Sequence, residues 1–172
     1  SAASDVYKRH EIDDDANYLG LAAGIQLAVG SGELKLASSD PNDPPYLDYN
    51  YLQEEFDRDR LRKGIRKVVE LETHPAIQEL IEGRITPTDE ELASDDALDE
   101  WLLKYTGTSH HISCTCKMGP ATDPMAVTGQ YGTVHGMEGL RIVDASIMPD
   151  LVRAPINPTV LMIGERIADA IS

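Results

Sequence analysis

Two runs in the first third of the chain alternate apolar and polar residues, which is typical of β-strands. Residues 18–29 are apolar and then alternate, and residues 33–37 alternate again after a Gly-Ser-Gly break at 30–32. A strand, a glycine turn and a second strand predict a β-hairpin. The prolines and Asx residues of 39–45 then require turns. A short extended run is predicted at residues 46–52.

Helical spacing replaces this alternation from residue 54. Between residues 54 and 72 the apolar positions recur on one helix face, which predicts an amphipathic helix. His74 ends this helix because a residue before proline avoids the helical region, and a short helix is predicted at residues 76–81. Capping signals begin at Thr88 and again just before a helix predicted at residues 97–104.

The last third of the chain is rich in Gly, Pro, His and Met. Within it, residues 139–144 predict a short buried strand, and residues 160–171 carry apolar positions at helical spacing and predict a helix. Hairpin strands followed by helices, without repeated strand–helix alternation, indicate the α+β class. The sequence therefore predicts an antiparallel sheet with helices.

Charge and composition narrow the possible partners. The formal net charge is −15, from 30 acidic and 15 basic side chains, so nucleic acid and anionic lipid are not expected partners. No apolar run approaches the about 20 residues of a membrane span. Cys114 and Cys116 are expected to be free thiols in a reducing compartment, which favours a cytoplasmic location. The N-terminus shows no secretion signal, although a longer parent chain would place any such signal upstream.

The first candidate for chemistry is the segment HHISCTCKMG at residues 110–119. A neutral imidazole accepts a proton near neutral pH, so a histidine here could serve as a general base. It could equally be a structural histidine held by backbone hydrogen bonds. A metal site is a third possibility, but zinc sites usually gather four ligands from two separated pairs, and His135 is the only nearby recruit. The residues alone leave these alternatives open.

Two later segments also combine features of ligand sites. Residues 134–149 place Asp144 and small residues at the carboxyl end of the predicted strand, where open sheets bind ligands. Asn157-Pro158-Thr159 begins the last helix. Asn157 or Thr159 could cap that helix, which would be a structural role. Alternatively, the N-terminus of the helix could face an anionic or electron-rich ligand. The sequence contains no G-x-G-x-x-G fingerprint. The chain therefore lacks the usual device for holding a dinucleotide pyrophosphate.

Together these segments resemble the C-terminal region of the glucose–methanol–choline oxidoreductases. That family's pattern is H-x-x-G-T-C-x-M-G, then V-H-G-x-x-G-L-R-V-x-D-A-S-x-M-P, and then His or Asn before a final helix. The matching text here is HISCTCKMG at 111–119, VHGMEGLRIVDASIMP at 134–149 and NPTVLMIGERIADAI at 157–171. One residue departs from the pattern: Cys114 stands where the family usually has glycine.

The resemblance implies an FAD-dependent oxidoreductase that acts on the CH–OH group of a small-molecule alcohol, with hydride transfer to the flavin. It implies that His111 is the catalytic base and that Asn157 is a second catalytic residue, which hydrogen-bonds the same substrate oxygen. His110 is expected to line the substrate pocket or to be structural. Asparagine at position 157 is typical of the choline-type branch. Few aromatic residues are available for a cation cage, however, so choline itself is not indicated.

The same resemblance implies a set of flavin-binding residues. Asp144 and Ala145 are expected near the phosphate–ribityl part of the cofactor, and Asn157, Pro158 and Thr159 near its ring. The positive end of the last helix would then stabilise the reduced, anionic flavin.

The family resemblance also implies a division of the chain. Residues 1–133 are expected to form part of a substrate-binding domain with the catalytic-histidine loop. Residues 134–172 would be a C-terminal strand and helix returning to an FAD-binding Rossmann-like domain that is otherwise absent from this chain. The N-terminal FAD-binding half of the same enzyme, in the same or a separate chain, is thus the expected partner, and the chain alone should be inactive. The alternatives are a non-catalytic binding module or heteromer subunit and, less favoured, a His/Cys metal-site domain.

Overall fold

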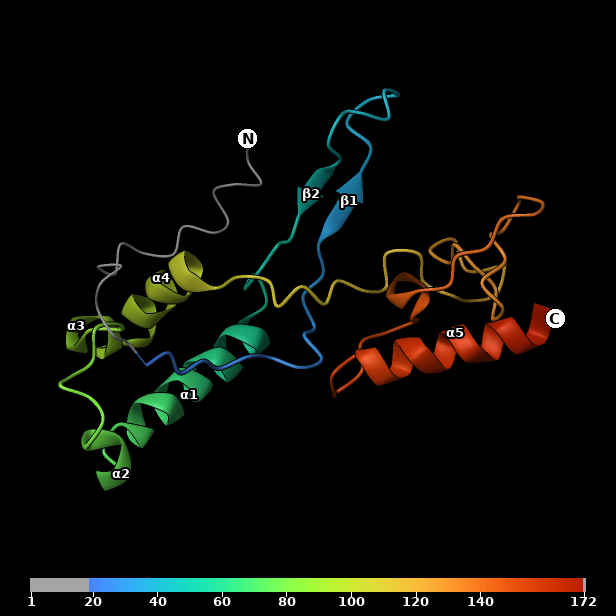
Figure 1. Cartoon of the computed structure of the whole chain (residues 1–172). Coiled ribbons are helices and arrows are strands. Elements are labelled where there is room, and N and C mark those ends of the chain that lie inside the picture. Colours follow the sequence, from blue (N-terminus) through green and yellow to red (C-terminus); the bar gives the residue numbers. More distant parts are fainter. Residues whose placement is uncertain (1–18, 172) are drawn as a thin grey trace. The chain divides into compact units, whose positions relative to one another are not determined.

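The structure is a computed structural model, and it describes residues 19–171 (Figure 1). The chain divides into two compact units. Unit 1 comprises residues 19–25 and 51–107, and unit 2 comprises residues 26–50 and 108–171.

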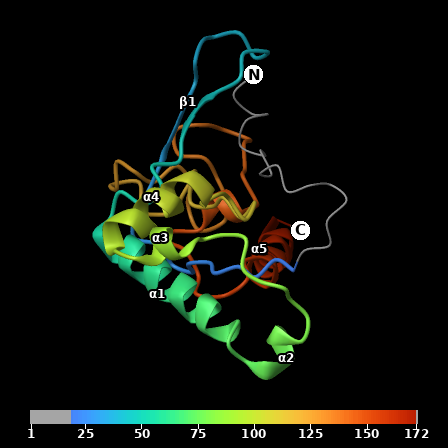
Figure 2. The same ribbon diagram turned by 90° about the vertical axis from the view of Figure 1, so that its left-hand side faces the viewer.

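Unit 1 is helical. It contains α1 (Glu55–Leu71), α2 (Pro75–Gln78), α3 (Asp89–Leu92) and α4 (Asp95–Tyr105). α4 packs against both α1 and α3 (Figure 2). The predicted helices are confirmed with small shifts at their ends, and α2 is shorter than the predicted 76–81.

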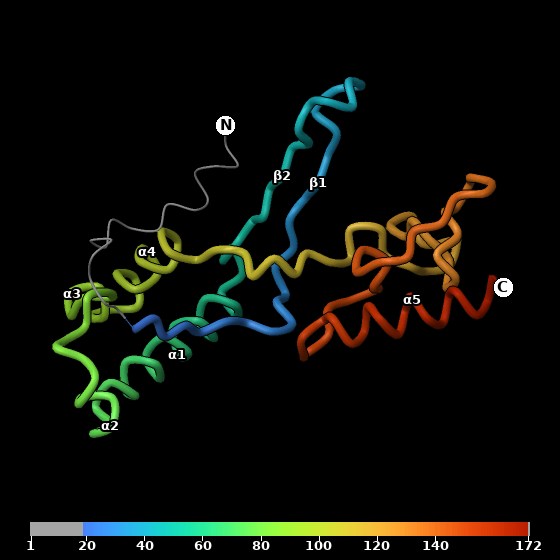
Figure 3. The backbone as a smooth tube through the Cα atoms, in the orientation of Figure 1, coloured from blue at the N-terminus to red at the C-terminus, as the bar shows by residue number. Residues whose placement is uncertain are grey.

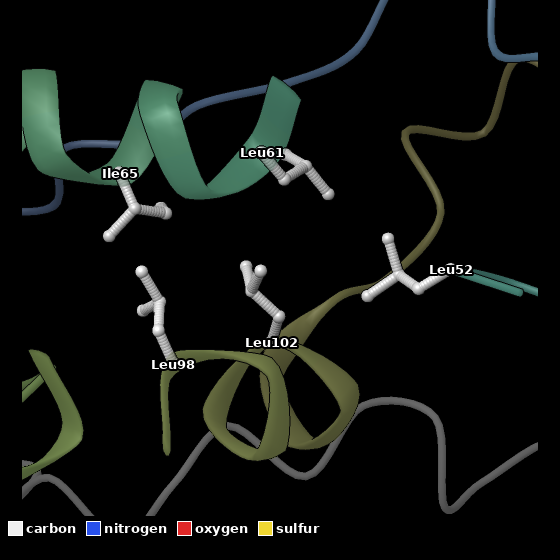
Figure 4. Packing of buried hydrophobic residues seen from close by; sticks show 5 residues of the cluster. All are labelled: Leu52, Leu61, Ile65, Leu98 and Leu102. Carbon is white, nitrogen blue, oxygen red and sulfur yellow. The ribbon is translucent and has the colours of Figure 1, made fainter. Parts of the chain in front are cut away.

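The core of unit 1 is aliphatic and comes mainly from α1 and α4. Its five buried side chains are Leu52, Leu61, Ile65, Leu98 and Leu102 (Figure 4). The two residues from each helix are four positions apart, so they lie on one helix face and meet the pair from the other helix. Leu98 is completely buried.

In unit 1, side-chain caps start α3 and α4, and ion pairs join α1 to α4. The Thr88 side chain accepts the N–H of Glu91, whose own carboxylate accepts the N–H of Thr88. This capping box starts α3. The guanidinium of Arg62, buried between α1 and α4, donates to Asp99 at 2.8 Å and also pairs with Glu55.

The sheet of unit 2 has two short antiparallel strands, β1 (Glu33–Lys35) and β2 (Tyr46–Asp48), with Leu34 opposite Leu47. All six strand residues are exposed. A Cβ at Gly32 would lie 2.1 Å from the Asp48 carbonyl oxygen, so the close approach of the two chains at this end of the hairpin requires glycine.

The predicted strand at residues 18–29 is wrong for its described part, because residues 19–29 contain no strand; Tyr18 lies outside the described residues. The partner of β1 is β2, which follows it in the chain. Ala23 and Ile25 pack instead against the helical core of unit 1. These apolar residues are therefore used for packing rather than for pairing.

Most of unit 2 is irregular chain beside one long helix, α5 (Asn157–Ile171) (Figure 3). Ile163 and Ile167 of α5 are buried with Ile147 and Met148, and these four form the core of unit 2. The predicted C-terminal helix is confirmed. Helices with a two-stranded antiparallel sheet are also consistent with the α+β class.

The strand predicted at residues 139–144 is wrong. Arg141 makes only an isolated bridge to Thr133, and the side chain of Asp144 caps a short 3-10 helix, η2 (Ala145–Ile147). This capping turns the chain, so a ladder cannot extend through Asp144. The return of residues 134–172 to an FAD-binding domain stays a prediction, as does the division at residue 133. Within residues 19–171, no helix is long and apolar enough to cross a membrane.

Candidate active site

The loop that carries the two adjacent histidines has an unusual backbone. His110 and His111 are both exposed. The φ angles of His110 and Cys114 are 62° and 67°, in the left-handed region that favours glycine. Glycine, the usual family residue at position 114, would adopt this conformation without a steric cost, whereas Cys114 adopts it with a side chain attached.

Backbone hydrogen bonds join this first segment to the second. Residues 114–118 run beside η2. Every second N–H of residues 114–118 donates to the next carbonyl oxygen of η2. These bonds are Cys114 to Ala145 at 3.2 Å, Cys116 to Ser146 at 2.9 Å and Met118 to Ile147 at 2.8 Å. The contact is non-local, and it fixes the end of the histidine loop against the segment proposed to bind flavin.

Asp144 and Ala145 are both tied into this junction. One carboxylate oxygen of the exposed Asp144 accepts the Ser146 N–H at 2.7 Å and the Ser146 hydroxyl at 2.5 Å. Ala145 is half-buried and packs against the core of unit 2. Its small side chain lets the 114–118 segment approach closely.

The third segment is the first turn of α5. Val160 N–H donates to the Ile156 carbonyl at 3.0 Å, so Ile156 takes the cap position and the expected capping by Asn157 or Thr159 is wrong. Asn157, Pro158 and Thr159 instead occupy the first three helical positions. Asn157 and Pro158 are exposed, and the first turn contains no acidic residue.

All three segments contact one apolar cluster. Cys114, Ala145 and Ile156 pack as partly buried residues against the buried core formed by η2, Met148 and α5. The structure thus brings together the end of the histidine loop, the Asp-Ala segment and the residue before Asn157. Convergence of the His111 imidazole and the Asn157 amide on one substrate oxygen stays a prediction.

The two cysteines are not disulfide-bonded. Cys114 and Cys116 are free thiols, and burial raises the pKa of the Cys114 thiol. Among the residues that the structure describes, no group of three or more His, Cys, Asp or Glu side chains could hold a metal ion.

Two residues near the site were not recognised from the sequence. The Nε2 of His135 lies 3.0 Å from the Gly119 carbonyl oxygen, and since a carbonyl only accepts, Nε2 carries the proton in this contact. In the sequence, His135 was considered only as a possible metal ligand. Its position in the V-H-G motif was the signal that could have indicated a structural role. The Ser113 hydroxyl is buried, and no sequence signal indicated this.

The family model for GMC oxidoreductases matches residues 28–164. The chain belongs to this family. The match is to its C-terminal region, and the chain is choline dehydrogenase-like. It is 41% identical over 165 residues to the oxygen-dependent choline dehydrogenase of Pectobacterium carotovorum subsp. carotovorum (strain PC1), covering 90% of this chain and 29% of that protein.

Solved structures give the same assignment. A fungal aryl-alcohol oxidase is 34% identical, with a TM-score of 0.67, covering 81% of this chain and 23% of that one. A variant of formate oxidase from Aspergillus oryzae RIB40, studied for FAD modification, is 29% identical with a TM-score of 0.75, covering 82% of this chain and 24% of that one. The chain thus spans less than a third of the length of these proteins.

One structural observation agrees with an FAD site. The first turn of α5 is exposed at Asn157 and Pro158 and carries no acidic side chain. The N-terminus of a 15-residue helix therefore keeps its partial positive charge available to an electron-rich ring or an anion.

Proposed function

We propose that this chain supplies the alcohol-activating residues of an FAD-dependent oxidoreductase acting on CH–OH groups. The observation that carries the proposal is the set of hydrogen bonds joining Cys114–Met118 to η2, in a unit whose core also holds the start of α5. These bonds join two of the three segments that resemble the family's active site, and packing of Ile156 on the same core adds the third. Membership of the GMC oxidoreductase family supports the same reaction class.

His111 is the proposed general base. If the carbinol hydrogen left a neutral alcohol as hydride, positive charge would build on the carbon. Prior loss of the hydroxyl proton removes that cost. In our proposal the His111 imidazole accepts this proton, because histidine is the side chain that does so most readily near neutral pH. The Asn157 amide donates to the same oxygen and holds the alcohol in place. His110 lines the substrate pocket.

FAD, when bound, accepts the two electrons and the hydrogen released from the carbinol carbon. Asp144 and Ala145 would lie near its phosphate–ribityl part, and Asn157, Pro158 and Thr159 near its ring. The dipole of α5 would stabilise negative charge on that ring. The chain has no dinucleotide fingerprint, and in our proposal an N-terminal FAD-binding part of the enzyme holds the pyrophosphate.

The proposed substrate class is a small alcohol. The relative from Pectobacterium is named as a choline dehydrogenase, whereas a structural relative is an aryl-alcohol oxidase. Choline and benzyl alcohol are therefore the two substrates to compare first. The cytoplasmic location favoured by the cysteines stays a prediction.

The first experiment combines this chain with its FAD-binding part, in one polypeptide or as two. We expect flavin absorbance at one FAD per complex and alcohol oxidation, neither of which the chain gives alone. A complex that binds no flavin and oxidises no alcohol would favour the non-catalytic binding module.

The second experiment tests the base in that complete enzyme. We expect His111→Ala to lower turnover by about a thousandfold, because general-base catalysis contributes about 10²–10⁴-fold. His74→Ala, which replaces an exposed histidine at the start of α2, is the matched control and should keep full turnover. The role of His111 as a base is refuted if both variants turn over alcohol at the unaltered rate.

A further inference from the structure

Two left-handed residues flank the tripeptide His111–Ser113. The φ angles are 62° at His110 and 67° at Cys114. Outside glycine, residues 19–171 adopt positive φ at only three other positions, Leu27, Asn50 and Leu52. A side chain disfavours this backbone region, so both ends of the tripeptide hold conformations that the surroundings must stabilise.

The surroundings of Cys114 supply that stabilisation. Its N–H donates to the Ala145 carbonyl at 3.2 Å, and its side chain packs against the core formed by Ile147, Met148, Ile163 and Ile167. The side chain therefore connects the end of the histidine loop to the hydrophobic core of unit 2. Glycine would allow the same φ but would have no side chain to make this contact.

We propose that Cys114 is a positioning residue for His111, in which packing of the cysteine side chain holds the left-handed backbone conformation of residue 114 and keeps the tripeptide His111–Ser113 rigid. The importance of this for turnover rests on the proposed function of His111. The rigidity of the loop does not depend on it, so the two claims can fail separately.

Cys116 provides a matched comparison within the same segment. Its N–H also donates to η2, at 2.9 Å to the Ser146 carbonyl, and it too is half-buried. It is not among the residues with positive φ. Cys116→Ala thus also removes one cysteine sulfur, two residues away from Cys114. The backbone of residue 116 is not left-handed, so it does not need side-chain packing to hold it.

The test measures backbone order parameters and amide exchange in the 172-residue chain. The unaltered loop should be rigid at residues 111–113, with order parameters near about 0.85, and Cys114→Gly should lower them below about 0.6. Exchange of the residue-114 amide should accelerate by about tenfold. Cys114→Ala retains the unfavourable φ and loses the sulfur, so it should accelerate this exchange as well. Cys116→Ala should leave the order parameters of residues 111–113 unchanged.

Two results would overturn the proposal. One is a loop that is already flexible in the unaltered chain, and the other is a Cys114→Gly loop as rigid as that of Cys116→Ala. Uniform acceleration of amide exchange in α5 as well would indicate a general stability role instead, and would also overturn it. Order parameters of α5 residues Ile163 and Ile167 serve as the internal reference.

Turnover in the complete enzyme separates this inference from the proposed function. Cys114→Gly should lower kcat by about tenfold with little change in KM, because a mobile base spends less time in the reactive geometry, whereas Cys116→Ala should not. If the loop loosens as expected but His111→Ala turns over normally, the proposed function fails and the positioning inference stands. If His111→Ala is inactive but Cys114→Gly keeps full kcat, positioning fails alone.

Discussion

The two units of the chain are built in different ways. Unit 1 consists of helices whose apolar faces meet in an aliphatic core, with ion pairs between α1 and α4. Unit 2 has one long helix, two three-residue strands and much irregular chain. Every candidate site residue lies in unit 2.

The difference shows how irregular backbone can carry a site. Loops offer exposed backbone and varied side-chain directions, which regular helices do not. The cost is that their hydrogen bonds must be made individually, as Cys114, Cys116 and Met118 do with η2. The helices of unit 1 satisfy most of their backbone groups locally, within each helix.

Two natural probes distinguish the units in experiments. The single tryptophan of the chain, Trp101, lies in α4 of unit 1. Both cysteines lie in unit 2. Tryptophan fluorescence therefore follows unit 1, and thiol labelling follows unit 2.

Leu98→Ala should give the largest stability change, and only in unit 1. Leu98 is completely buried between α4 and α1, and truncation of a buried leucine costs about 3 kcal/mol. We expect the urea midpoint of Trp101 fluorescence to fall accordingly, with little change in thiol labelling.

Leu103→Ala is the control on the same helix, because Leu103 is 59% exposed. It should alter the free energy of unfolding by no more than about 0.5 kcal/mol. Equal shifts in the fluorescence and thiol signals for Leu98→Ala would show that the two units unfold together.

Ile147→Ala should produce the reverse pattern. Ile147 is completely buried in the core of unit 2, and we expect a loss of about 2–3 kcal/mol there. Since about 1.4 kcal/mol corresponds to a tenfold change in an equilibrium constant, labelling of Cys114 in a Cys116→Ala background should accelerate by about thirtyfold or more through local opening.

For this variant the reference is Leu161→Ala on the exposed face of α5, which should label at the original rate. Trp101 fluorescence should not move in either variant. A lower urea midpoint for Trp101 in Ile147→Ala would contradict the separation of the two cores.

The helices of unit 1 could be predicted because their information is local. The apolar period of residues 54–72 predicts α1 at nearly its observed bounds. The helix predicted at residues 97–104 begins two residues earlier, because Ser94 caps it. Capping and amphipathic period both act within a few residues, so one sequence contains enough to find them.

Strand partners could not be predicted in the same way. The alternation at residues 33–37 indicated a strand correctly, but its partner was assigned to residues 18–29 instead of 46–48. Alternation identifies the faces of a strand and does not identify which other segment pairs with it. The turn-rich segment at residues 39–45 suggested that the hairpin had already ended. In the structure this segment lies in the loop that joins β1 to β2.

The candidate site shows the same division between local and non-local information. Its motifs identified the family and the three segments that meet in unit 2. The bond from Cys114 to Ala145, 31 positions later, is visible only in the structure. The left-handed φ of His110 has no sequence signal, because the residue is not glycine. For Cys114 the only signal was the glycine that the family usually has at this position.

Acid should expose a last and smaller contrast between the units. In unit 1 hydrogen bonds from Arg62 and then Arg58 lower the pKa of Glu55, and one from Arg66 lowers that of Asp95. In unit 2 a backbone N–H, that of Met125, is the main cause of the lowered pKa of Asp123. A carboxyl whose pKa is lower in the folded state stabilises that state above its unfolded pKa. Unit 1 should therefore lose stability as the pH falls below about 4.5, and unit 2 as it falls below about 3.9, in each case through the folded values.

Salt should separate these two causes. The arginine pairs of unit 1 are partly exposed charges, so about 1 M salt should screen them and shrink the acid-induced shift of the Trp101 midpoint. Asp123 accepts the Met125 N–H and also pairs with Lys117, whose Nζ lies 3.0 Å from the carboxylate. Salt screens only the lysine pair and not the backbone hydrogen bond, which is the larger cause, so the acid response in thiol labelling should change less. Arg66→Gln removes one of the two arginine partners of Asp95, and it should reduce the salt-sensitive part of the Trp101 response while leaving unit 2 as it was. Equal salt sensitivity in both units would mean that charge pairs, rather than backbone donors, govern both.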